Sequence, residues 1–167
     1  TLRHENRLKS LSNGALTYLF EKLKSSRFSS PIDGGASILA REIRKATDEL
    51  DGPYILFANF MDAHGPLYPV SGYDSEIASV PGSWQMHNVD IDPLLFEQSP
   101  ETVEEYDSFL DAYRSLYAAS VEYLDRKVSA TIEYVQSNTD RPVTTVITAD
   151  HGENLAYPGD EYLFQHY

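Results

Sequence analysis

Residues 54–61 read YILFANFM, an apolar run that follows directly on Gly52 and Pro53. A run that is apolar at successive positions, without alternation, is typical of a strand covered on both faces in a parallel sheet. A second β-rich run, from Val143 to Thr148, lies near the other end of the chain. The sequence therefore predicts two buried parallel strands joined by a long connection, which is the crossover of an α/β fold.

Three other stretches carry apolar residues at helical spacing. They run from about Arg3 to Ser26, from Ile38 to Leu50, and from about Ser99 to Ser137. Gly52 and Pro53 lie where the second helix should end, and Ser99-Pro100 supplies an N-cap and a first-position proline for the third. The expected architecture is a single α/β domain over residues 1–167, with a mostly parallel sheet flanked by helices.

Composition narrows the classes of function. The chain has 167 residues, of which 41% are hydrophobic, so it can form one domain with a core. Its 26 acidic and 13 basic residues give a formal charge of −13, which repels nucleic-acid phosphates and anionic lipid, so neither is expected as a partner. The acidic residues are scattered through the chain and not gathered in a tail, which suits a solvated surface in high salt. No run approaches the roughly 18 apolar residues of a membrane span.

Cysteine is absent from the chain. Disulfides, thiolate metal sites and a thiol nucleophile are therefore excluded within it, and a reducing compartment such as the cytoplasm is compatible with the sequence.

Polar side chains follow both predicted strands. Asn59, Asp62 and His64 stand in NFMDAHGPLYP. Asp150, His151 and Glu153 stand in ITADHGENL. Loops beyond the carboxyl ends of parallel strands meet at one edge of the sheet, so the two groups are expected to face one crevice.

Two interpretations of the second group remain open from the residues alone. Asp150 and His151 offer a carboxylate and an imidazole to a divalent cation, and the turn at Gly152 lets them converge. Alternatively, Asp150 and Glu153 are the N-cap and third residue of a helix, which needs no metal. His64 likewise is either a substrate contact or a polar turn residue, and His166, in LFQHY, has less context still.

Together, ILFANFMDAHGPLYP and VTTVITADHGENL resemble the two blocks that mark the C-terminal half of the sulfatase branch of the alkaline phosphatase superfamily. The acidic composition resembles members from halophilic archaea. The resemblance implies that Asp150 and His151 complete a divalent-metal site. The bound metal is usually calcium in sulfatases, and manganese or zinc in some related hydrolases. It also implies that His64 contacts the transferred sulfate or phosphate group or the leaving oxygen, and that His166 lies near another anion-contacting position.

The resemblance also defines what this chain lacks. The family expects acidic metal ligands from an N-terminal part and a nucleophile in a Cys/Ser-x-Pro-x-Arg motif. The Ser-x-Pro strings at Ser29 and Ser79 have no such arginine. The chain is therefore expected to be part of a longer catalytic domain and inactive alone, while the complete protein hydrolyses a sulfate ester of a small molecule or glycan, or a phosphate ester.

Two other functions remain as alternatives. One is a phosphodiesterase or phosphoglycerol-type transferase of the same superfamily, which would use the same metal site. The other is a non-catalytic α/β interaction domain, in which DHGEN is only a capped turn. The oligomeric state is not indicated by the sequence.

Overall fold

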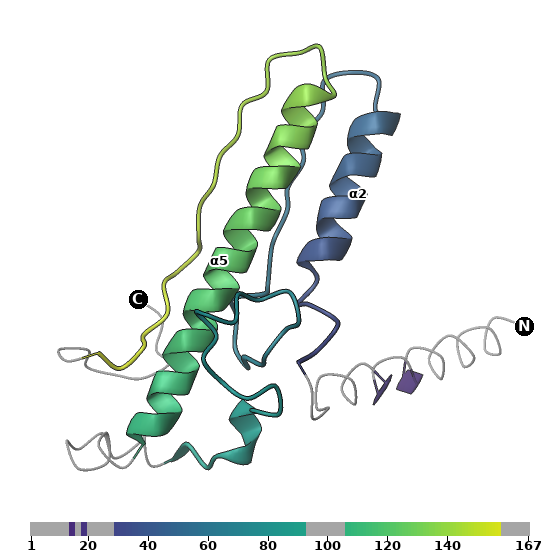
Figure 1. Cartoon of the computed structure of the whole chain (residues 1–167). Helices are drawn as coiled ribbons and strands as arrows, with labels where there is room; N and C mark the ends of the chain where they lie inside the picture. Colours follow the sequence, from purple (N-terminus) through teal and green to yellow (C-terminus); the bar gives the residue numbers. More distant parts are fainter. Residues whose placement is uncertain (1–13, 16–17, 20–28, 93–105, 158–167) are drawn as a thin grey trace, which may run out of the picture.

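The computed structural model describes residues 14–15, 18–19, 29–92 and 106–157 (Figure 1). Its main elements are helix α2 (Ala36–Glu49), the short 3-10 helix η1 (Met86–Asn88) and the long helix α5 (Asp107–Ser137). Helix α2 packs beside the C-terminal part of α5, and extended segments run back along the pair. None of the helices in the described part of the chain is long and apolar enough to cross a bilayer.

The predicted helices agree with the structure where it can be compared. The helix expected over Ile38–Leu50 is α2, and Leu50 has extended backbone angles that end it. Helix α5 covers most of the third predicted helix, whose expected beginning at Ser99 and Pro100 lies outside the described residues. Most of the helix expected over Arg3–Ser26 also lies outside them, although Gly14, Ala15, Tyr18 and Leu19 are helical.

The predicted parallel sheet is wrong for the described residues. Segments 54–61 and 143–148 are extended, but neither is paired, and the β-bridge recorded among these residues joins Ser30 to Val70. The side chain of Ile55 is 96% exposed and that of Val146 is 82% exposed. The prediction failed because an apolar run indicates that side chains favour burial, whereas a strand also needs a neighbour whose backbone groups complete the ladder. The described chain is therefore helical with extended segments, not α/β.

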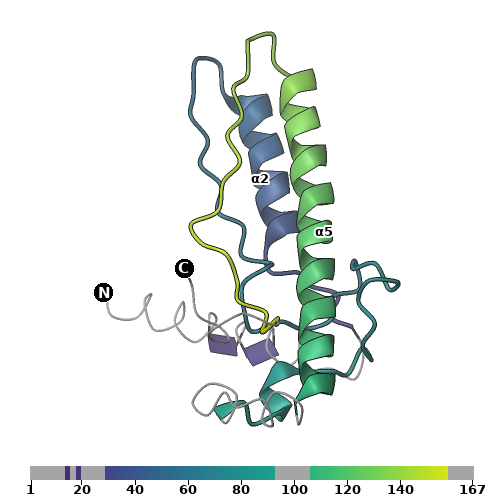
Figure 2. The same ribbon diagram turned by 90° about the vertical axis from the view of Figure 1, so that its left-hand side faces the viewer.

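One part of the expected arrangement is nevertheless present. After α2 the chain turns and residues 54–61 run back along the helix pair, and residues 143–148 do the same after α5 (Figures 1 and 2). Both segments therefore run in the same direction, on one side of the two helices. The motif that follows each segment is carried toward the N-terminal end of the helix before it.

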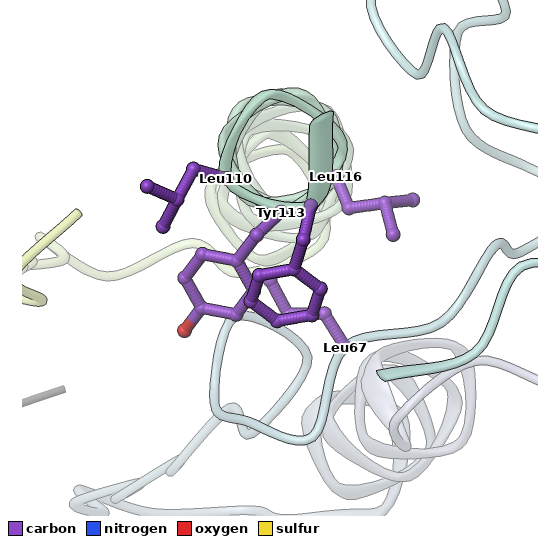
Figure 3. Packing of buried hydrophobic residues seen from close by; sticks show 5 residues of the cluster. Leu67, Leu110, Tyr113 and Leu116 are labelled. Atoms are coloured by element: carbon purple, nitrogen blue, oxygen red, sulfur yellow. The ribbon is translucent and has the colours of Figure 1, made fainter. Parts of the chain in front are cut away.

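The hydrophobic core lies on the N-terminal half of α5. Its buried members are Leu67, Phe109, Leu110, Tyr113 and Leu116. Figure 3 shows Leu110 and Leu116 on opposite sides of α5, with the ring of Tyr113 between them and Leu67 approaching from a neighbouring loop. The same loop adds Trp84, whose ring lies 5.8 Å from that of Phe109. The segment that contains Leu67 and Trp84 is thus part of the core, and it packs against the first turns of α5.

Candidate metal and substrate site

Asp150 and His151 lie together at the end of the second extended segment. The Asp150 Oδ2 atom is 3.8 Å from the His151 Nε2 atom. Two donor atoms that each bind one cation at about 2.0–2.5 Å are separated by no more than about 4–5 Å, so this spacing allows both to reach the same ion. The Asp150 side chain is 91% exposed and that of His151 is 27% exposed, so the pair is open to solvent on the carboxylate side.

The tautomer of His151 follows from its backbone contact. The Nδ1 atom lies 2.8 Å from the carbonyl oxygen of Gly152. Because a carbonyl oxygen only accepts, Nδ1 carries the proton, and the neutral ring has its lone pair on Nε2. A metal-bound histidine is commonly oriented in this way, with the other ring nitrogen donating to a backbone carbonyl.

The donor set fits only part of a divalent-metal site. No group of three or more His, Cys, Asp or Glu side chains converges on one point among the residues that the structure describes. A hard cation such as calcium takes about six to eight oxygen ligands. Asp150 and His151 can therefore supply one side of the coordination sphere, and further ligands must come from elsewhere.

The helix-capping interpretation of Asp150 and Glu153 is not observed. Residues 151–157 form no helix. The Asp150 Oδ1 atom accepts the amide of the next residue, His151, at 3.1 Å. The Glu153 carboxylate instead accepts a hydrogen bond of 2.8 Å from the hydroxyl of Tyr113. Glu153 is thus an anchor to α5.

Helix α5 holds the segment after the motif at several points. The Arg114 Nε atom donates to the carbonyl oxygen of Leu155 at 2.9 Å, and its Nη2 atom donates to that of Ala156. The Arg114 guanidinium also lies 4.6 Å from the centre of the Tyr157 ring. Burial, together with the bond to Glu153, raises the pKa of Tyr113, so its hydroxyl remains a donor at neutral pH. These anchoring roles were missed at the sequence level, where the only signal was a tyrosine in an apolar stripe, whose hydroxyl needs a partner when buried.

His64 occupies a tight turn and is exposed. Its amide donates to the carbonyl oxygen of Met61 at 3.1 Å, and its Nδ1 atom lies 2.6 Å from the carbonyl oxygen of Gly65. The argument given for His151 applies again, so Nδ1 carries the proton. In the neutral ring the Nε2 atom then accepts a hydrogen bond, and in the protonated ring it donates one.

Asp62 fixes the turn of His64 to the beginning of α2. This carboxylate is only 5% exposed, and it accepts the amides of Gly34 at 2.8 Å and Ala36 at 3.1 Å. The approach is close enough to require glycine, because a Cβ atom at position 34 would lie 2.9 Å from the Asp62 Cα atom. The turn therefore has little freedom to move relative to the helix.

Asp33 provides a second carboxylate at the same helix end. It accepts the amides of Gly35 at 3.0 Å and Ser37 at 2.9 Å, and the hydroxyl of Tyr123 on α5 at 2.7 Å. Negative charge is favourable here because the unpaired amides of a helix N-terminus carry partial positive charge. The network joins α2 to α5 beside the turn of His64.

The two carboxylates differ in acidity. Burial alone would raise the pKa of Asp33, but the hydrogen bonds from Ser37, Tyr123 and Gly35 lower it below the usual value. Burial raises the pKa of Asp62, and the nearby charge of Asp33 raises it further. Burial, with the adjacent Asp33, also raises the pKa of Tyr123 to about 12. Asp33 is therefore the member of the pair that carries negative charge most readily.

The structure brings the predicted site residues together only in part. Asp150 and His151 adjoin, whereas the hydrogen bonds of His64 lie within its own turn. The turn of His64 is tied to α2 near Tyr123, and the other motif is tied to α5 at Tyr113. Tyr113 and Tyr123 are about 15 Å apart along α5. His166 lies outside the described residues.

Comparison with known protein families identifies the family of the sequence. The family model described as Sulfatase matches residues 17–166. The chain belongs to the sulfatase family. The match includes both motifs of this sulfatase-family chain, so the resemblance inferred from them is confirmed. Neither the curated proteins nor the solved structures yielded a match.

Membership in the sulfatase family indicates a general class of chemistry. At the level of the family, the match indicates a hydrolase and implies sulfate-ester substrates. His64, Asp150 and His151 all lie within the matched residues, and so does His166.

Proposed function

We propose that this chain supplies part of a metal centre and a substrate-contacting histidine to a hydrolase of sulfate esters. The observation that carries the proposal is the 3.8 Å spacing between the Asp150 Oδ2 and His151 Nε2 atoms, with His151 oriented by the Gly152 carbonyl oxygen. The family match supports the class of reaction. The substrate is a sulfate ester of a small molecule or of a glycan.

Asp150 and His151 would hold the cation. A carboxylate with an imidazole is compatible with calcium, and also with manganese or zinc. When bound, the cation polarises the ester and offsets the negative charge that develops during reaction. The anchors from Tyr113 and Arg114 keep the segment after the motif in place, so that the two ligands need little rearrangement to bind.

His64 would act on the transferred group. Its Nε2 atom can donate a hydrogen bond to a sulfate oxygen or a proton to the leaving oxygen when the ring is protonated. Asp62 maintains the position of the turn through the amides of Gly34 and Ala36. His166 is assigned a contact with the anion, on the resemblance alone.

The nucleophile is not supplied by a recognisable motif of this chain. There is no cysteine, and the serines at 29 and 79 lack the arginine that completes the motif of the family. Without an activated nucleophile a metal can only polarise the ester. We therefore expect no turnover by this chain alone.

An assay of the complete protein tests the proposal. We expect it to hydrolyse an aryl sulfate, and Asp150→Asn to reduce kcat/KM by at least about 100-fold through loss of a metal ligand. Asp140→Asn, an exposed acid in the turn after α5, is the matched control and should have no effect. An aryl phosphate and an aryl phosphodiester are tested in parallel. Turnover of the phosphodiester without turnover of the sulfate would favour the phosphodiesterase alternative, and full activity in Asp150→Asn would contradict the metal assignment.

A further inference from the structure

A groove with a volume of about 360 Å³ runs between α2 and α5, away from the residues assigned above. Four of its lining residues are cations, two from each helix. The lining consists of Ser37, Ala40, Arg41, Arg44, Arg126, Lys127 and Ala130. The whole chain has only 13 lysines and arginines, and its formal charge is −13. A group of cations on one groove is therefore a local exception to an acidic surface.

Two of the four cations are paired with neighbouring carboxylates. The Arg126 Nη2 atom donates to Glu122 at 3.0 Å and to the carbonyl oxygen of Gly72 at 2.9 Å. The Arg41 Nη2 atom donates to Glu42 at 3.1 Å. These contacts hold the two guanidinium groups in place and neutralise part of their charge.

The other two cations lie on tyrosine rings, one of which Arg126 also overlies at 5.5 Å. The Arg44 guanidinium is 5.1 Å from the centre of the Tyr134 ring, and the Lys127 ammonium is 5.0 Å from that of Tyr123. Within the described part of the chain, neither cation forms an ion pair with a carboxylate at contact distance. A ring face orients a cation without using its N–H donors, so those donors remain available to a ligand.

The tyrosines are themselves held in position. The Tyr134 hydroxyl donates to Asp48 at 2.8 Å, and the Tyr123 hydroxyl donates to Asp33 at 2.7 Å. Each of these two cations thus lies over a ring whose hydroxyl is bonded to an acid. The arrangement fixes where the cations lie, which lowers the cost of ordering them around an anion.

We propose that this groove is a binding site for a tetrahedral oxoanion, the sulfate or phosphate group of a small ester. Four cations line the groove, and Glu42 and Glu122 pair with two of them. Asp33 and Asp48 lie one tyrosine further away, so the anion would be bound by the N–H donors of Arg44 and Lys127 and not by a net positive charge. Ala40 and Ala130 leave space between the helices because their side chains are short. The volume is at the small end of ligand sites, which suits one charged group with little attached to it.

The site is separate from the proposed reaction centre. None of its lining residues is His64, Asp150 or His151. Binding here requires neither a metal nor turnover, so the inference stands or falls independently of the proposed hydrolysis.

Titration of the protein with sodium sulfate, followed by nuclear magnetic resonance of the alanine methyl groups, tests the site. Chloride replaces sulfate in the reference so that ionic strength is constant. The groove variant is Arg44→Gln with Lys127→Gln. The control variant is Lys45→Gln with Arg141→Gln, which removes the same charge from exposed positions outside the groove. Circular dichroism checks that both variants remain helical.

We expect saturable shifts at Ala40 and Ala130 in the wild-type and control proteins. The groove variant should bind at least about tenfold more weakly, because charge-assisted hydrogen bonds are lost. Titrations with inorganic phosphate and with a monosaccharide sulfate establish which group is preferred and whether an attached sugar is accepted. Shifts that do not saturate, that spread over the whole surface, or that are equal in the groove and control variants would overturn the proposal. If the groove variant does not fold, the location and saturation of the shifts in the wild-type protein still test whether the groove binds sulfate.

Discussion

The hydroxyl of Tyr113, in the core of the chain, donates a hydrogen bond of 2.8 Å to the carboxylate of Glu153, which follows the Asp150–His151 pair. The two residues are 40 positions apart in the sequence. This bond joins the candidate metal-binding segment to the best-packed part of α5. It explains how an exposed loop can present two ligands in a fixed relation.

Tyr113→Phe should therefore weaken metal binding without unfolding the chain. We expect the affinity for manganese or calcium to fall about 10-fold, which is typical of removing a residue that orients the metal-binding side chains without binding the metal itself. The free energy of unfolding should fall by only about 1 kcal/mol. Tyr117→Phe, one turn further along α5, is the control. Unchanged metal affinity in Tyr113→Phe would show that Glu153 does not position the pair.

Asp33→Asn should lower the free energy of unfolding by about 1–2 kcal/mol at pH 7. The Asp33 carboxylate, at the start of α2, accepts hydrogen bonds from two backbone amides and from the Tyr123 hydroxyl. The pKa of Asp33 is lowered from 3.8, so its ionised form stabilises the fold above that pH, and this contribution is lost as the pH falls through the folded-state pKa. The difference between variant and wild type should therefore shrink as the pH falls below the ordinary value. Urea unfolding across this range measures it, with the exposed Asp125→Asn as control. A difference that is constant with pH would contradict the assignment.

Gly34→Ala should disturb the turn that carries His64. Its Cβ atom would lie 2.9 Å from the Asp62 Cα atom, so backbone must shift, at a cost of about 1–3 kcal/mol. Gly52→Ala is the matched control, because a Cβ atom there meets nothing within 4 Å. Thermal unfolding and the imidazole resonances of His64 report the two effects. Equal stability of the two variants would mean that Asp62 and Gly34 are less tightly packed than described.

The acidic composition predicts a response to salt. Screening of the repulsion among 26 carboxylates, at a formal charge of −13, should raise the midpoint of thermal unfolding between low and about molar potassium chloride. Melts followed by circular dichroism measure this. A midpoint that is unchanged or lower in high salt would show that the acidity has no role in stability.

The sequence predicted those features that depend on neighbours along the chain. Apolar spacing located α2 and most of α5, because helical hydrogen bonds join residues four positions apart. The clustering of Asp150 and His151 also follows from adjacency. The pairing of segments 54–61 and 143–148 could not be predicted in the same way, since strand partners are set by distant residues.

The hydrogen bonds that hold the two motifs in place could not be predicted, because they depend on which helix faces meet. Asp62 binds the amide of Gly34, 28 positions earlier, and Tyr123 binds Asp33 across 90 positions. No local pattern distinguishes these acids from others in an acidic chain. The interpretation of Asp62 and Glu153 as site residues was therefore incomplete, because both serve mainly to hold the motifs in place.

Calorimetric titration of this chain with calcium and manganese, in about 0.15 M potassium chloride to suppress nonspecific association, tests the central claim most directly. The account predicts weak, saturable binding with a Kd of about 0.1–1 mM, because Asp150 and His151 supply only part of a coordination sphere. Asp150→Asn and His151→Gln should each remove that binding, whereas Asp140→Asn should leave it intact. Binding that survives Asp150→Asn, or that is equally reduced by Asp140→Asn, would contradict the assignment of these residues as metal ligands.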